Sequence, residues 1–225
     1  MEKIYALLAG KCKSSRLFTY VCDVTYYDQV QILRDVAKGY FGNIDIWIND
    51  EGIGHPETEI WTFTPDRVKE VIDTNLTGAI YGSVIALKGM LGQGFGSVYN
   101  MEGLGSNGPI IGDLALYGTS KSALSYLTKS MVKETQGILI LVGEIIPGMV
   151  ATKLITEQYD VCPEEWECFK SNLNILSDRV ETVTPWLARK VLNNYKNGVN
   201  IMWLSMVKIL KLFLIAPFYK RKIFD

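Results

Sequence analysis

The chain of 225 residues is 48% hydrophobic and 21% charged, with a formal net charge of −1. This composition is typical of one globular domain with a sizeable core, and the near-neutral charge argues against nucleic acid as a partner. The four cysteines have no Cys-x-x-Cys spacing and His55 is the single histidine, so neither a metal site nor a histidine-dependent triad is expected. No secretory signal pattern is seen, which favours a reducing, cytoplasmic location.

Short apolar segments alternate with helical patterns, which predicts an α/β fold with a parallel sheet. The predicted strands are residues 17–24, 44–48, 96–101 and 138–146. The predicted helices are residues 28–40, a long segment from 64–65 to 91, residues 117–134, and two helices that start near Pro163 and Pro185. The long helix has a typical N-cap and first-turn pair in Thr64 and Pro65.

Tyr117 and Lys121 are four residues apart on a predicted helix and therefore share one face. A free phenol titrates near pH ~10, and a neighbouring ammonium favours the phenolate, so we expect Lys121 to lower the pKa of Tyr117. Such a pair can exchange a proton with a carbonyl or alcohol oxygen. The pair alone is a weak signal, because two surface residues of an amphipathic helix have the same spacing.

Five motifs occur in order at the ends of predicted elements. They are Cys22-Asp23-Val24, Asn49-Asp50-Glu51-Gly52, Thr74-Asn75-Leu76-Thr77-Gly78, Tyr117-Gly118-Thr119-Ser120-Lys121, and Pro147-Gly148 with Thr152. Together they resemble the short-chain dehydrogenase/reductase family over most of residues 17–155. The resemblance implies a Rossmann-like doubly wound parallel sheet. It also implies an oxidoreductase that uses NAD or NADP to reduce a carbonyl, or oxidise an alcohol, of a small molecule.

The resemblance implies a role for each matching residue. Tyr117 would donate the proton, Lys121 would hold the nicotinamide ribose, and Asn75 would hold a water. The family's catalytic serine has no direct counterpart, because Gly103 takes its position; Ser106 either replaces it or only caps the glycine-rich loop. The residues that would contact the cofactor are Asp23, Asn49, Gly52, Tyr117, Lys121, Pro147, Gly148 and Thr152.

The chain departs from the family pattern near the nucleotide. Glu51 stands where the family has a small alanine; it would weaken binding of an anionic cofactor if it pointed inward, and would have no effect if it pointed to solvent. The sequence also lacks the Thr-Gly-x-x-x-Gly-x-Gly turn that binds the pyrophosphate. We therefore expect the first two strands to be missing, and a non-catalytic relative that serves as a binding or oligomerisation scaffold is the alternative function.

Without those strands, three arrangements of the sheet are open. The 17–24 strand could pair directly with the 44–48 strand, could keep its family position beside an open slot, or could leave a slot that another segment fills. Each buried unpaired backbone group costs ~1–3 kcal/mol, so an open slot is unfavourable. We predict direct pairing, with the 28–40 helix as the crossover of a βαβ unit.

Several stretches resemble one branch of the family, the chlorophyll b reductases. They are residues 44–49, 100–106, 117–121, 147–150 and 174–176. This resemblance implies reduction of a formyl group on a chlorophyll-like tetrapyrrole.

We expect the dehydrogenase domain to span residues 1–198, followed by an apolar, basic tail over residues 199–225. A tail helix over residues 201–216 would either lie on an anionic membrane surface as a peripheral contact or pack on the fold. The family also pairs its long helices between subunits, and Ile80, Val84 and Leu87 have suitable apolar spacing. A homodimer or homotetramer is therefore predicted.

Overall fold

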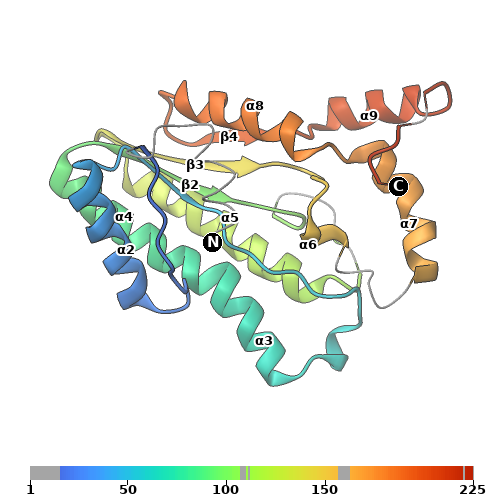
Figure 1. The fold of residues 1–225 in the computed structure, drawn as a ribbon, viewed down its shortest axis with the longest axis horizontal. Coiled ribbons are helices and arrows are strands. Elements are labelled where there is room, and N and C mark those ends of the chain that lie inside the picture. Colours follow the sequence, from blue (N-terminus) through green and yellow to red (C-terminus); the bar gives the residue numbers. More distant parts are fainter. Residues whose placement is uncertain (1–15, 107–109, 111, 157–162, 220, 225) are drawn as a thin grey trace.

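The computed structural model describes residues 16–106, 110, 112–156, 163–219 and 221–224. Within these ranges, one sheet of parallel strands has the order β1-β2-β3-β4. The strands are β1 (Ile46–Asn49), β2 (Gly96–Met101), β3 (Ile140–Ile146) and β4 (Val199–Met202). Helices cover both faces of this sheet (Figure 1), which confirms the predicted Rossmann-like doubly wound fold.

The helices are α2 (Tyr27–Phe41), α3 (Pro65–Ile72), α4 (Gly78–Gln93), α5 (Ala115–Glu134), α6 (Lys153–Thr156), α7 (Pro163–Leu176), α8 (Val180–Leu192) and α9 (Met206–Ile215), with a 3₁₀ turn η2 (Ile60–Thr62) and a π-helical turn η3 (Asp73–Thr77). Helices α4 and α5 pack on one face of the sheet, and α2 lies against α4. Helix α8 packs against β4. Because α8 begins at Val180, the expectation of a helix that starts near Pro185 is wrong.

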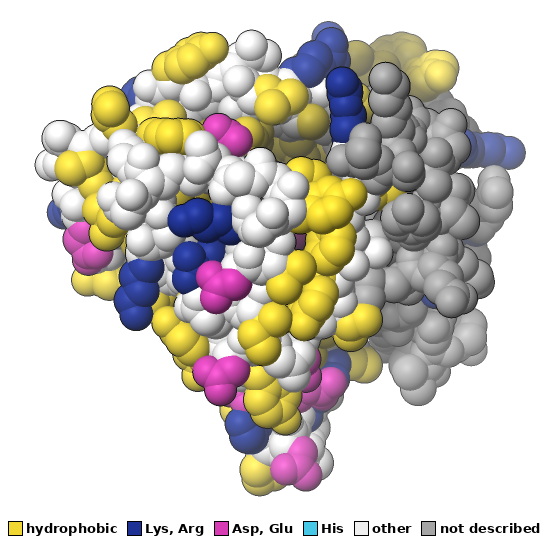
Figure 2. Space-filling model, turned by 60° about the vertical axis from the view of Figure 1, so that its left-hand side comes forward, with side chains coloured by type: hydrophobic (Ala, Val, Ile, Leu, Met, Phe, Trp, Pro, Cys, Tyr) yellow, Lys and Arg dark blue, Asp and Glu magenta, His cyan; other side chains and the backbone are white. Residues whose placement is uncertain are grey.

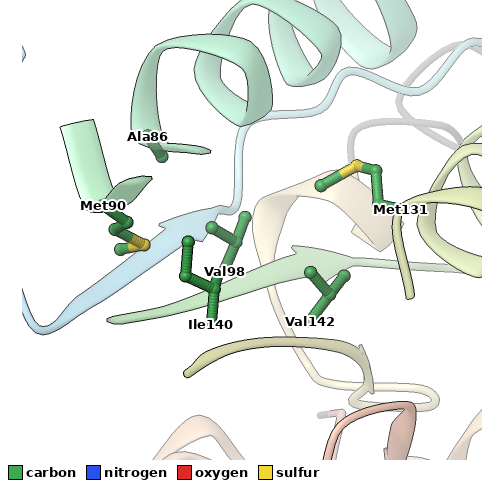
Figure 3. Close-up of a cluster of buried hydrophobic side chains, with 6 residues drawn as sticks. All are labelled: Ala86, Met90, Val98, Met131, Ile140 and Val142. Carbon is green, nitrogen blue, oxygen red and sulfur yellow. The ribbon is translucent and has the colours of Figure 1, made fainter. Parts of the chain in front are cut away.

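Two buried clusters hold these layers together. The first joins α4 and α5 to β2 and β3 (Figure 3), and consists of Ala86, Met90, Val98, Met131, Ile140 and Val142. The second joins the sheet to α8, and consists of Tyr99, Ile145, Val183, Leu187, Val191 and Ile201. Since successive side chains of a strand point to opposite faces, Val98 belongs to the first cluster and Tyr99 to the second. The two clusters therefore fix the positions of the strands, and with them the strand ends where the site lies.

The long helix predicted after Thr64 is present, and it contains a break. The Thr64 side chain caps it by accepting the Arg67 backbone N–H at 3.3 Å, and Pro65 is its first residue. Between α3 and α4 the chain widens into the π-helical turn η3, which contains the buried Asn75. Turns of this kind inside α-helices are frequent at functional sites.

The predicted pairing of residues 17–24 with β1 is wrong. Residues 17–24 form no strand, and in the described part of the chain β1 pairs with β2 alone. Local turn chemistry competes with strand formation here, because the Asp23 carboxylate accepts the Thr25 backbone N–H at 2.9 Å and the Thr25 hydroxyl at 2.7 Å. Figure 2 shows one face of the molecule, on which hydrophobic side chains are exposed in a band. The expectations for residues 1–15 lie outside the described residues.

The expected domain boundary at residue 198 needs a correction, because β4 begins at Val199 and completes the sheet through pairing with β3. Helix α9 follows, capped by Ser205, whose hydroxyl accepts the Lys208 backbone N–H at 3.3 Å. The Lys208 ammonium also donates to Asp178 at 2.8 Å, and Arg221 forms an ion pair with the same carboxylate. The tail is thus tied to the fold at several points. No helix in the described ranges is long and apolar enough to cross a membrane.

Candidate active site

The site lies at the carboxyl edge of the sheet. Because the strands are parallel, the ends of β1, β2 and β3 meet there, at Asn49, Met101 and Ile146. In open α/β sheets this edge is where ligands bind. Helix α5 starts near the same edge and carries Tyr117 in its first turn and Lys121 one turn later.

Tyr117 is half-buried at this edge, and its hydroxyl lies directly against Gly103. A Cβ atom added to Gly103 would come within 2.3 Å of the Tyr117 Oη. Burial raises the pKa of Tyr117 to about 12, so the phenol holds its proton at neutral pH. The expectation that Lys121 lowers this pKa is therefore wrong for this structure: removal of the phenol from water is the dominant effect.

Lys121 is 4% exposed. Its ammonium donates to the Met101 carbonyl at 3.1 Å and lies 5.8 Å from the centre of the Tyr117 ring. Burial lowers the pKa of Lys121, while the carboxyl groups of Asp50 and Glu102 oppose that shift. Since an ammonium has three donors, the bond to Met101 leaves Lys121 with capacity for a ligand.

Gly52 and Asn75 lie beside the same ammonium. A Cβ added to Gly52 would lie 3.3 Å from the Lys121 Nζ and 3.6 Å from the Asn75 Oδ1, so the absence of a side chain lets the backbone approach the ammonium closely. The Asn75 amide donates to the Ile53 carbonyl at 3.0 Å and to the Ser120 hydroxyl at 3.1 Å, and its oxygen accepts the Ile53 N–H at 2.8 Å. Both amide donors are used, and the oxygen retains one acceptor position for a water.

In this arrangement Ser106 is hydrogen-bonded within its own loop through its hydroxyl. Its hydroxyl donates to the Gly103 carbonyl at 2.7 Å and its backbone N–H bonds to the same oxygen at 3.2 Å. Its position is the one expected if Ser106 caps the glycine-rich loop, which was the second alternative for this residue. Its role as the substitute for the family's serine stays a prediction, and it would require Ser106 to exchange the Gly103 carbonyl for a ligand.

Two of the residues predicted to contact a cofactor are occupied by protein partners. Asn49 accepts the Trp47 indole N–H at 2.7 Å and donates to Ser83 at 3.0 Å and to Asn100 at 2.8 Å, so its amide joins β1 to β2 and α4. The Asp23 carboxylate binds Thr25, and these bonds lower the pKa of Asp23. The hydrogen bonds of both side chains thus stabilise the fold.

The other predicted residues lie in the segments that follow β1 and β3. Glu51 is exposed. This agrees with the alternative in which Glu51 points to solvent and does not affect cofactor binding. Pro147 and Gly148 follow the end of β3, where Leu204 packs against Gly148. Thr152 is exposed, and its carbonyl accepts the Ile155 N–H at 3.1 Å at the start of α6.

Sequence reasoning missed two buried groups near Tyr117. The ring of His55 contacts the start of α5 from a loop far away in the sequence. The carboxyl groups of Glu102 and Glu144 are hydrogen-bonded to each other, and burial, followed by the charge of Glu144, raises the pKa of Glu102 to about 8. No sequence signal marks either contact, because each depends on how β2, β3 and α5 pack.

A parallel, doubly wound sheet with a Tyr–Lys pair at its carboxyl edge defines a Rossmann-type fold. A family model described as short chain dehydrogenase matches residues 1–161, and the chain therefore belongs to that family.

Curated relatives place the chain near the chlorophyll b reductase branch, as predicted. It is 29% identical to the probable chlorophyll(ide) b reductase of Arabidopsis thaliana over 201 residues, which cover 89% of this chain and 39% of that protein. It is 32% identical to carbonyl reductase family member 4 of Xenopus laevis over 136 residues, which cover 60% of this chain and 57% of that protein. The chain thus spans about two fifths of the length of the reductase from Arabidopsis.

Solved structures share the fold. Levodione reductase superposes with a TM-score of 0.78 at 25% identity, covering 89% of this chain and 81% of that one. The closed form of serine dehydrogenase, complexed with NADP+, superposes with a TM-score of 0.77 at 18% identity, covering 92% of this chain and 82% of that one.

Proposed function

We propose that the chain reduces a carbonyl group of a small molecule with NADH or NADPH, and that Tyr117 donates the proton to the carbonyl oxygen. The observation that carries this proposal is the position of the Tyr117 hydroxyl, against Gly103 at the carboxyl edge of the sheet. With its pKa raised to about 12, the phenol is protonated and able to donate at neutral pH. The names of the similar proteins, among them a carbonyl reductase, support the same direction of reaction.

The residues present fit the nicotinamide end of such a cofactor. The bare backbone at Gly52 lies beside the buried ammonium of Lys121, and Lys121 has donors left for ribose hydroxyls. Solved relatives in complex with NADP+ or NAD+ support this class of cofactor. A bound reduced nicotinamide would supply the hydride. Lys121 would orient the ribose, and Asn75 would keep the loop at Ile53 in place beside it.

The substrate class is a finer proposal. The similarity to chlorophyll(ide) b reductases, together with the stretches shared with that branch, supports a formyl group on a chlorophyll-like tetrapyrrole. Tyr117 would protonate the formyl oxygen as that group becomes a hydroxymethyl group. The same chemistry applies to a smaller aldehyde or ketone, so turnover of both kinds of substrate should be compared.

Calorimetry with NADH and NADPH tests the proposal. We expect micromolar binding of one or both cofactors, and we expect Lys121→Met to weaken it at least about tenfold, because a lost charge-assisted hydrogen bond costs ~1.5–3 kcal/mol. Lys133→Met, an exposed lysine on the same helix, is the matched control and should bind normally. Absence of binding at millimolar cofactor would reject the reductase.

Absence of cofactor binding would favour a non-catalytic relative that serves as a scaffold. The observations that favour it are the engaged side chains of Asn49 and Asp23, together with the glycine at position 103. A homodimer or homotetramer is proposed for either function, and light scattering would measure it. Leu87, one of the residues proposed for that interface, packs against the chain's own core, so its apolar character is used within one subunit.

We also propose a peripheral contact of α9 with an anionic membrane. One face of the helix is apolar and exposed, and consists of Met206, Val207, Leu210, Phe213 and Leu214. The exposed Lys211 and Lys222 supply positive charge nearby. A truncation at residue 198 would remove β4, so substitutions are the better test.

The wild-type chain should sediment with vesicles that contain anionic phospholipid, and the double variant Leu210→Ser with Phe213→Ser should sediment several-fold less. Leu192→Ser, an exposed leucine on α8, is the control. Equal sedimentation of all three proteins would show that α9 does not bind the membrane.

A further inference from the structure

The first turn of α5 lacks a local cap. The leading N–H groups of any helix have no partner within the helix. The residue at the N-cap position of α5 is Leu114, whose side chain makes no capping hydrogen bond. The backbone N–H of Tyr117, two residues after the helix begins at Ala115, is one of these leading groups. The proposed proton donor therefore lies on a helix end that needs an acceptor from elsewhere in the fold.

His55 supplies that acceptor from a loop 62 residues earlier in the sequence. The Tyr117 N–H donates to the His55 Nε2 at 3.1 Å. The other ring nitrogen, Nδ1, lies 2.7 Å from the Pro56 carbonyl oxygen. A carbonyl can only accept, so Nδ1 carries the proton and Nε2 presents a lone pair. The neutral ring with its proton on Nδ1 is the one form that makes both hydrogen bonds.

The surroundings of His55 hold this ring in place. It is 1% exposed and packs edge-on against Phe63 at 4.7 Å between ring centres. The loop around it is bound on both sides, since the Arg67 guanidinium donates to the Gly54 carbonyl and the Thr58 N–H donates to the Asp113 carbonyl at 3.0 Å. One of these contacts ties the loop to α3, and the other ties it to the residue before Leu114.

We propose that His55 is a positioning residue for Tyr117: by binding the Tyr117 backbone, it fixes where the phenol lies against Gly103. This role rests on the proposed reductase function. The Tyr117 hydroxyl occupies the space that a Cβ at Gly103 would fill, so its place depends on where the first turn of α5 lies. A small movement of the first turn of α5 would move the hydroxyl away from the substrate oxygen, and misplacement by about 1 Å can cost on the order of a hundredfold in rate.

Two substitutions separate the hydrogen bond from the volume of the ring. His55→Leu fills much of the space without an acceptor, whereas His55→Gln can place a side-chain oxygen near the position of Nε2. For His55→Leu we expect a fall in kcat of about tenfold to a hundredfold, with the affinity for NADPH changed less than about twofold. For His55→Gln we expect most of the rate to return. Phe63→Leu, which alters the packing of the ring and leaves its acceptor, is the control.

A second readout does not require activity. Because His55 is the single histidine, the ring signals in a nitrogen-15 NMR spectrum need no further assignment. The spectrum should show a proton on Nδ1 and none on Nε2. The Tyr117 amide should exchange with solvent slowly in the wild type and in His55→Gln, and at least about tenfold faster in His55→Leu, as a lost hydrogen bond of ~1.4 kcal/mol implies.

The two readouts keep this proposal separate from the function on which it rests. If no carbonyl compound is reduced, the proposed function fails, and the NMR results still decide whether His55 holds the Tyr117 backbone. A ring with its proton on Nε2 would overturn the proposal. So would His55→Leu with normal kcat and a slowly exchanging Tyr117 amide.

Discussion

The Tyr117→Phe variant is expected to lose carbonyl reduction by about 10²–10⁴-fold in kcat, the range that a positioned general acid contributes. The phenylalanine ring keeps the packing of Tyr117 and removes only the hydroxyl that lies against Gly103. The affinity for NADPH should stay within about twofold, because the side chain of Lys121, and not the phenol, is proposed to hold the ribose. Single-turnover kinetics together with calorimetry would measure the two effects separately.

The matched control is Tyr126→Phe, which removes the hydroxyl of a tyrosine that is 78% exposed on the same helix. Its kcat should equal that of the wild type. If Tyr117→Phe reduced carbonyl compounds as fast as the wild type, then Tyr117 would not be the proton donor, even if the chain proved to be a reductase.

Stability should fall as the pH rises from about 5 to about 8, and Glu102→Gln should remove much of that dependence. The pKa of Glu102 is raised to about 8 by burial, and further by Glu144, to which it is hydrogen-bonded. In the unfolded chain a glutamate releases its proton near pH ~4.3. Between these two values the folded state holds a proton that the unfolded state has lost, so the free energy of unfolding decreases with pH.

Each pKa unit corresponds to ~1.4 kcal/mol, so the loss across this window is a few kcal/mol at most. Urea unfolding at pH 5, 7 and 9 would measure it. Above pH 8 the Glu102→Gln variant should be the more stable protein, because a neutral amide replaces a buried charge. Glu134→Gln, at an exposed position on α5, should keep the wild-type slope. Parallel curves for the wild type and Glu102→Gln would mean that Glu102 ionises normally.

Elements with a strong local pattern were predictable from the sequence. Strand β2 and helix α5 lie where the apolar periodicity predicted them. Each has one face buried in the core, and that face produces the periodic apolar pattern in the sequence. Residues 17–24 have a strand-like pattern and no strand structure, because a strand also needs a partner to complete its hydrogen bonds. Strand β4 was hidden inside an apolar run, where a helix and a buried strand cannot be told apart by periodicity.

The site could be predicted only as far as short-range spacing reaches. Tyr117 and Lys121 are one helical turn apart, and they lie at the edge where the motifs placed them. The contact between His55 and Tyr117 joins distant segments, so no local pattern could reveal it. The pKa of Tyr117 also depends on burial, which the sequence does not report, and that is why the expected direction of its shift was wrong.

The close approach of Gly103 to Tyr117 limits the order in which this site can change over evolution. A serine at position 103 would bring a Cβ within 2.3 Å of the Tyr117 Oη, so the tyrosine would have to move before the serine could be accommodated. The family's serine can therefore be introduced at position 103 only together with a shift of the Tyr117 ring. Laboratory evolution that restores the serine should acquire a compensating change in the first turn of α5 or in the loop that contains His55.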